Sequence, residues 1–420
     1  MSPKPGLRHN GDFQRYSAAR AVSTLGSHLS FLAFPLLVLS LSGSAAQAGL
    51  IASCTLLART LCQLPAGQVA DRVDRRRLLL GCDLVSLAAM GGVALMVAAH
   101  TTYFPLLLVA AVVCTVSDTF FSPAASVMVR DLVAENQLTE AIGRSQTNSA
   151  AATLVGPLLG GWLFTIGPVV PFACDTVSYG LSAVLILRVT GRRPAEVAAG
   201  GPKDRRLTAG LRWLSRQPML RRALMFAAVI NLVGAATDVA IVVSLRGHGT
   251  SGTVIGAVLA CAGVGGLVGA AISSRLVRLV GPARLLVLIG AGWTGGFVVF
   301  AAFPLSAYTA GAVLVLMLAL SPAAVVVIGQ ALLSGVPREL MGRVGAAASL
   351  LMAGLSALGP VLAGAGFELV GQAPTWLLLA LLTGLATLVT GPQMLRSSTF
   401  LSGSGGSPDT VAQRAPERAV

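Results

Sequence analysis

The feature that most constrains the fold is a series of about twelve apolar stretches separated by short polar turns. A helix needs roughly 20 mostly apolar residues to cross the hydrocarbon core of a bilayer. The short alternating segments of a membrane β-barrel are absent from the sequence. We therefore expect an all-α integral membrane protein with twelve transmembrane helices. The expected spans lie near residues 17–41, 46–66, 78–98, 104–127, 147–167, 170–189, 222–245, 253–274, 283–303, 308–332, 344–366 and 373–394.

The distribution of basic residues decides between a nucleic-acid partner and a membrane topology. The formal net charge is +14 and the chain holds 30 Lys and Arg, but these residues gather at the two ends and in the even-numbered loops. Only Arg246 falls in an odd-numbered loop. By the positive-inside rule, this asymmetry places the chain in the cell membrane with both termini in the cytoplasm. It leaves no basic face for nucleic acid.

The longest hydrophilic stretch divides the chain into two halves. We expect a six-helix bundle over 1–189, a cytosolic linker with an amphipathic helix over 190–221, a second six-helix bundle over 222–395 and a disordered cytosolic tail over 396–420. The halves resemble each other. The segment QTNSAAATLVGPLLGGWL aligns with SLLMAGLSALGPVLAGAGF at an offset of 203 residues, which indicates an internal duplication.

The densest charge cluster among the spans is the loop GQVADRVDRRRLL, which runs from Gly67 to Leu79. It places a glycine four residues before Asp71, which is followed by Arg72 and three further arginines. A generic positive-inside loop would explain the arginines alone. It would not require Gly67 and Asp71 at this spacing. In this interpretation the glycine permits a tight passage from helix to loop, and Asp71 accepts from free backbone donors at a helix start.

This loop resembles the signature loop between helices 2 and 3 of the major facilitator superfamily. Other stretches are similar to its enterobactin-exporter and macrolide-efflux branch, among them RAVSTLGSHL, FSPAASVMVRDLVAENQLTEA and VPRELMGRV. The resemblance implies two six-helix pseudo-repeats, a monomer, and proton-driven export of small amphipathic molecules. The chain departs from relatives at Ser27, where an acid is frequent, and in helix 4, where an arginine is replaced by a segment whose only charge is Asp118.

The resemblance also assigns roles to two motifs. In the loop, it implies a conformational latch in which Asp71 meets the start of helix 11 and either Arg72 or Arg76 meets Asp131. In helix 5, GPLLGG is similar to the antiporter signature of drug exporters. That motif comprises Gly156, Pro157, Gly160 and Gly161. Taken alone, it is equally explained by helix packing, because proline kinks a helix and glycines admit a close neighbour.

Ionisable residues within spans are expensive to bury, so each is a functional hypothesis. The candidates for proton coupling are Asp118, Asp238 and His28. Each has a structural alternative. Asp118 and Asp238 can be permanently paired, Asp118 for example with Arg59, and His28 can hydrogen-bond to a neighbour.

Three further charged residues lie within the expected spans. Arg20, Arg59 and Asp175 are candidates for intramembrane ion pairs. For Asp175 we expect a structural contact rather than a direct role in transport.

The sequence predicts a transporter rather than an enzyme. It contains no phosphate-binding GxxxxGK[ST] loop, so the expected energy source is an ion gradient, and no cofactor or metal site is expected. The expected partners are a small-molecule substrate, protons and the lipid bilayer. The alternatives are an importer or uniporter of a small metabolite and a membrane-embedded protein that does not transport, such as a prenyl transferase or a receptor.

Overall fold

The computed structural model describes residues 7, 9–190, 212–337 and 340–396. Within that part of the chain, twelve helical spans are long and apolar enough to cross a membrane. The predicted all-α class and the predicted number of spans are thereby confirmed. Most of the expected linker over 190–221 and nearly all of the expected tail over 396–420 lie outside the described residues, although residues 212–215 are helical.

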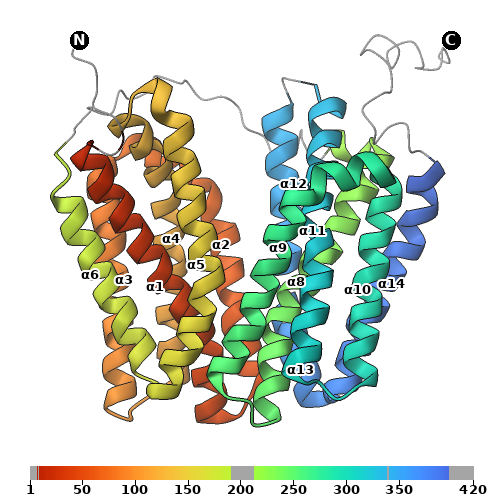
Figure 1. Ribbon diagram of the computed structural model, residues 1–420, viewed down its shortest axis with the longest axis horizontal. Helices are drawn as coiled ribbons and strands as arrows, with labels where there is room; N and C mark the ends of the chain where they lie inside the picture. The colour runs from red at the N-terminus through yellow and green to blue at the C-terminus, as the bar shows by residue number, and fades with distance from the viewer. Residues whose placement is uncertain (1–6, 8, 191–211, 338–339, 397–420) are drawn as a thin grey trace.

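The first six spans form one bundle (Figure 1). Its elements are α1 (Gly11–Ser42), α2 (Ala45–Arg72), α3 (Arg75–Ala98), α4 (Phe104–Leu132), the short 3₁₀ helix η1 (Glu135–Gln137), α5 (Leu138–Ile166) and α6 (Val170–Leu187). Within this bundle α1 packs against α5 and α6, α3 packs against α4 and α6, and α2 packs against α4.

The remaining spans form the second bundle, beside the first (Figure 1). Its elements are α8 (Pro218–Gly247), α9 (Gly252–Val280), α10 (Pro282–Ala302), α11 (Ala307–Gly335), α12 (Met341–Ser356), α13 (Gly359–Leu369) and α14 (Gln372–Arg396). Here α9 packs against α11, α10 against α14, and α8 against α12 and α13. Of all the spans described, α1 and α8 are the most buried, so they lie at the centre of the molecule.

Several helices run beyond the apolar stretches that predicted them. The helix α1 begins at Gly11, where the Asn10 side chain accepts a hydrogen bond from the Phe13 amide at 3.0 Å, and α5 begins at Leu138. The length of an apolar stretch matches the thickness of the hydrocarbon core. Polar residues can continue the same helix beyond the surface of the bilayer, so the helix is longer than its apolar stretch.

The eleventh span is interrupted. Its two segments, α12 and α13, meet at a turn over Ala357 and Leu358. Pro360 follows directly and has no amide hydrogen to donate, which removes one helical hydrogen bond at this point. The expected span near 344–366 is present as Met341–Leu369, and the turn within it was not anticipated from the sequence.

The two bundles meet along two seams, one between α2 and α13 and one between α5 and α9. We call the end of the molecule that carries Arg75, Arg130 and Arg278 the basic end and the opposite end the far end. Helix α1 begins at the basic end, and helix α14 ends there (Figure 1). The seams lie toward the far end, where α2 and α9 begin.

Backbone lies against backbone in both seams. A Cβ atom built on Gly161 of α5 would overlap the carbonyl group of Gly252 in α9, and one built on Gly49 of α2 would overlap the carbonyl of Pro360. The hydrogen bonds that join described residues of the two bundles also lie in the far half. The Ser44 hydroxyl and the Ala46 amide donate to Glu368, the Val361 amide donates to Ser53, and the Thr165 and Thr253 hydroxyls pair with each other. The far end of the described structure is therefore closed.

Candidate transport site and conformational latch

Helix α1 presents a polar face to the interior of the molecule. Arg20, Thr24 and His28 follow one another at spacings of one helical turn, and Phe31 lies three residues further on with 56% of its side chain exposed. The His28 Nε2 atom lies 3.4 Å from the Thr153 hydroxyl of α5. Of the two alternatives for His28, the hydrogen bond to a neighbour is therefore present, on a half-buried side chain.

Asp118 occupies the middle of α4 and faces this arrangement. Its carboxylate is coupled electrostatically to Arg20 of α1 and Arg59 of α2. Neither arginine forms an ion pair with it within the part of the chain that the structure describes. The Arg20 guanidinium instead lies over the ring of Phe121, 5.1 Å from its centroid. The permanent pairing of Asp118 with Arg59 is thus not present in this structure.

Asp175 of α6 is held by hydroxyl groups rather than by an arginine. Its side chain is fully buried and accepts hydrogen bonds from Ser30 at 2.6 Å and from Ser178 at 3.2 Å. A Cβ atom on Gly26 would overlap this carboxylate, so α1 and α6 approach closely here. The ion-pair assignment for Asp175 is therefore corrected, because serine hydroxyls from two helices already satisfy the carboxylate.

Sequence reasoning missed a second buried acid, Asp83 of α3. It is 1% exposed and accepts a hydrogen bond from Ser182 of α6 at 2.7 Å, which ties α3 to α6. It was overlooked because it lies only six residues after the last arginine of the cluster, so it was not distinguished from the charged loop. The available signal was its position within an apolar run. Elsewhere among the described residues, no group of His, Cys, Asp and Glu is arranged to hold a metal ion.

Helix α8 contributes two exposed polar residues, Asn231 and Asp238, seven residues apart and so on one face. The Asn231 side chain donates to the Ala227 carbonyl at 2.8 Å. Since α8 is buried for most of its length and also contacts α1 and α2, this exposed strip faces the space between the bundles. The Asp238 side chain is therefore exposed, although α8 itself is buried for most of its length.

The latch motif is arranged differently from the sequence-based expectation. Gly67 and Asp71 belong to the last turns of α2, and Asp74 rather than Asp71 caps α3 by accepting from the Arg77 amide at 3.0 Å. Asp71 is exposed, and it makes no hydrogen bond or ion pair with any residue described here. Apart from the neighbouring residues of its own helix, no described atom lies within 4 Å of a Cβ atom built on Gly67.

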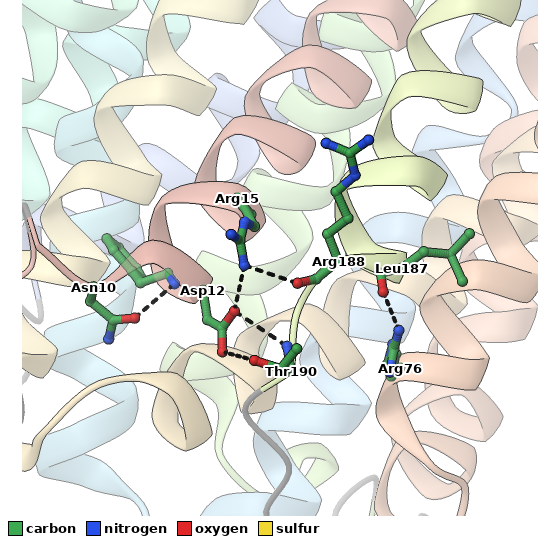
Figure 2. A network of polar contacts seen from close by, with 8 residues as sticks. Asn10, Asp12, Arg15, Arg76, Leu187, Arg188 and Thr190 are labelled. Atoms are coloured by element: carbon green, nitrogen blue, oxygen red, sulfur yellow. Dashed lines mark hydrogen bonds and ion pairs between the residues drawn. The ribbon is translucent and has the colours of Figure 1, made fainter.

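The arginines of the motif bind the first bundle at the basic end. Asp131 pairs with Arg75, not with Arg72 or Arg76 as expected. Arg76 donates instead to the Leu187 carbonyl at the end of α6 (Figure 2). The three arginines point in different directions around α3, and loop spacing alone could not indicate which one faces α4.

A polar network next to Arg76 ties the start of α1 to the end of α6 (Figure 2). Asp12 accepts from the amide and hydroxyl of Thr190 at 3.2 and 3.0 Å, and from Arg15 at 3.2 Å. Arg15 also donates to the Arg188 carbonyl at 3.1 Å. The basic end of this bundle is therefore held together as one unit.

The GPLLGG motif is a packing surface on two sides. Gly156 lies against His28 and Gly160 against the Leu29 carbonyl, so both admit α1. Gly161 admits α9, and the Pro157 carbonyl lies against Gly256 of the same helix. The motif therefore packs closely against two helices, α1, which carries the polar face, and α9 of the second bundle.

Comparison with known proteins places this geometry in context. The family model described as Major Facilitator Superfamily matches residues 16–360. The multidrug efflux pump Tap of Mycobacterium tuberculosis is 29% identical over 218 residues, which cover 48% of this chain and 52% of Tap. Macrolide efflux protein A of Streptococcus pyogenes is 28% identical over 151 residues, covering 36% of this chain and 37% of that protein. The chain thus spans about half the length, or less, of these curated relatives.

Solved structures share the fold. The crystal structure of a bacterial homologue of the human lysosomal transporter Spinster, in an inward-facing and unoccupied conformation, superposes with a TM-score of 0.69 at 16% identity. The match covers 97% of this chain and 100% of that one. At this identity the likeness concerns the fold alone.

Proposed function

The chain belongs to the major facilitator superfamily, and from this premise we propose that it is a proton-coupled exporter of small amphipathic molecules, such as an antibiotic, a siderophore or a secondary metabolite. It is a multi-pass membrane protein with the twelve-helix fold of transporters. Two bundles with a site between them alternate access between the two faces of the membrane.

The observation that carries the proton-coupling proposal is the environment of Asp118. Two arginines act on its carboxylate through space, yet neither forms an ion pair with it among the described residues. A carboxylate that is fully paired is fixed in its charged form, whereas this one can take up and release a proton as the arginines move. His28 lies on the same polar face of α1 as Arg20, beside the Thr153 hydroxyl, and extends the proposed route.

The lining of the space between the bundles supports an amphipathic substrate. Phe31 offers an exposed aromatic ring, and Asn231 and Asp238 offer polar groups from the facing bundle. A pocket that is mostly apolar with a few polar groups suits a molecule of mixed character.

Two arguments support the proposed direction and orientation. The basic end carries the arginines of the even-numbered loops, which supports an orientation in which this end faces the cytoplasm. The matched relatives from Mycobacterium and Streptococcus are named for efflux. With this orientation, the closed far end makes the structure an inward-facing state.

The proposal is tested in a bacterium that lacks its main efflux pumps and expresses this chain. We measure susceptibility to a panel of antibiotics and siderophores, with and without a protonophore. We expect resistance to at least one compound, and we expect Asp118→Asn, Asp71→Asn and the protonophore each to abolish it. The matched control is Asp83→Asn, since an asparagine oxygen can still accept from Ser182.

Two outcomes contradict the proposal. Resistance that survives both the protonophore and Asp118→Asn would exclude proton coupling through this residue. Accumulation of a compound by cells that express the chain, with the protein present in the membrane, would identify an importer or uniporter instead.

A further inference from the structure

A carboxylate from the second bundle caps a helix of the first bundle at the far end. Glu368, in the last turn of α13, accepts hydrogen bonds from the Ser44 hydroxyl at 3.0 Å and from the Ala46 amide at 2.9 Å. Ser44 is itself the N-cap of α2 and accepts from the Gln47 amide at 3.1 Å. The free amides and the positive end of the helix dipole favour a negative charge at this position.

This contact closes the seam without belonging to a packed core. Glu368 is exposed and borders a cavity of about 550 Å³. Residues of both bundles line this cavity, among them Ser44, Ser244 and His248. Because the surroundings are open, replacing Glu368 removes the contact but leaves the packing of α13 intact.

The other seam has a neutral contact at the equivalent position. The offset of 203 residues that relates Pro157 to Pro360 also relates Thr165 to Glu368. In the seam of α5 and α9, the Thr165 and Thr253 hydroxyls lie 3.5 Å apart, the limit of a hydrogen bond. The two seams are therefore related by the duplication, but only that of α2 and α13 carries a charge.

The same pair of spans has a carboxylate at the opposite end. Asp71 lies in the last turn of α2, and the start of α12 has no side-chain cap at Leu340. In this structure Glu368 is engaged, while Asp71 has no partner among the described residues. Each of the two spans thus carries a carboxylate near its C-terminal end, and at the far end that carboxylate already contacts the N-terminus of the other span.

We propose that Glu368 is a positioning residue that holds the far end closed, and that it acts in alternation with Asp71 at the basic end. In the present state the Glu368 contact is formed. When the far end opens, Glu368 leaves the start of α2, and Asp71 meets the start of α12. The inference rests on the alternating access of the proposed function and adds a second, reciprocal latch to it.

Hydrogen–deuterium exchange of the full chain in lipid nanodiscs tests the inference without a substrate. In Glu368→Gln the amide oxygen can still accept both hydrogen bonds, but the negative charge at the start of α2 is lost. We expect exchange to rise roughly three- to tenfold at the start of α2 (45–51) and also at the start of α9 (252–258), because charge-assisted hydrogen bonds are replaced by weaker neutral ones. At the basic end, over 66–72 and 340–347, exchange should fall. Glu368→Thr, which introduces the residue type of the other seam, should have the same effect.

Matched variants separate a latch from a local helix cap. Thr165→Ala removes the neutral contact of the other seam and should leave exchange at both ends unchanged. Asp71→Asn should change exchange in the opposite sense to Glu368→Gln, with slower exchange at the far end. Faster exchange confined to 45–51 in Glu368→Gln would overturn the inference, because it would reduce Glu368 to a cap of α2. Reciprocal exchange in a protein that confers no resistance would retain the latch and count against export alone.

Discussion

Acidic side chains inside the first bundle are held in two ways. Asp83 and Asp175 accept hydrogen bonds from serine hydroxyls and join α6 to α3 and α1. Asp118 is coupled to Arg20 and Arg59 through space. A satisfied carboxylate stabilises the fold, whereas a carboxylate that lacks direct partners can change its charge during a cycle.

The hydroxyl contacts predict a loss of stability when one donor is removed. Ser30→Ala leaves Asp175 with Ser178 as its remaining hydroxyl donor, and we expect the free energy of unfolding to fall by about 1–2 kcal/mol. Thermal unfolding of the purified protein in detergent measures this change. Ser40→Ala is the control, since the Ser40 hydroxyl donates only within α1. Equal unfolding temperatures for both variants would show that Ser30 contributes nothing.

Among single residues, the charged groups within the spans could be found from the sequence, but the groups that they contact could not. Asp118, His28 and Asp175 were found because charges in apolar spans are rare. Arg75 was not identified as the partner of Asp131, because three consecutive arginines begin α3 and only the rotation of that helix selects the one that faces α4. For Asp175 a structural contact was expected, but its serine donors were not identified because one of them, Ser30, comes from α1, far away in the sequence.

At the scale of helices, the two seams depend on residues without side chains. A methyl group on Gly161 would overlap the Gly252 carbonyl, so Gly161→Ala should destabilise the closed far end by about 1–3 kcal/mol. We expect this variant to lose resistance while it still reaches the membrane, as measured by susceptibility assays and immunoblotting of membranes. The control is Gly92→Ala in α3, where nothing lies within 4 Å of the added carbon. Full resistance in Gly161→Ala would mean that the seam can widen at no cost.

The number of helices followed from the sequence, but their ends and interruptions did not. Each apolar stretch of sufficient length became a span, because the bilayer imposes that length. Helix α5 nevertheless starts nine residues earlier than its apolar stretch, at Leu138 instead of residue 147. The turn at Ala357 was missed because Pro157 in the matching segment lies within an unbroken α5, so the same dipeptide has two local outcomes.

For the whole molecule, the segregation of arginines predicts one orientation. Fusion of a fluorescent protein after Arg396 should give fluorescent cells, because the basic end then faces the cytoplasm. Alkaline phosphatase fused in the turn at Gly43 should be active, since it lies at the far end and reaches the periplasm. Activity of phosphatase at Arg396 would reverse the orientation, and the closed end would then be cytoplasmic.

The glycine seams also bear on how such a protein acquires new substrates. Positions such as Gly161 and Gly49 admit no side chain, so we expect them to tolerate almost no substitution. Phe31 and Asp238, in contrast, project from α1 and α8 without forming any part of the seams. Laboratory evolution toward a different substrate should therefore accumulate its changes on these two central helices and leave the glycines untouched. Substrate preference and the closing of the far end are thus free to diverge independently.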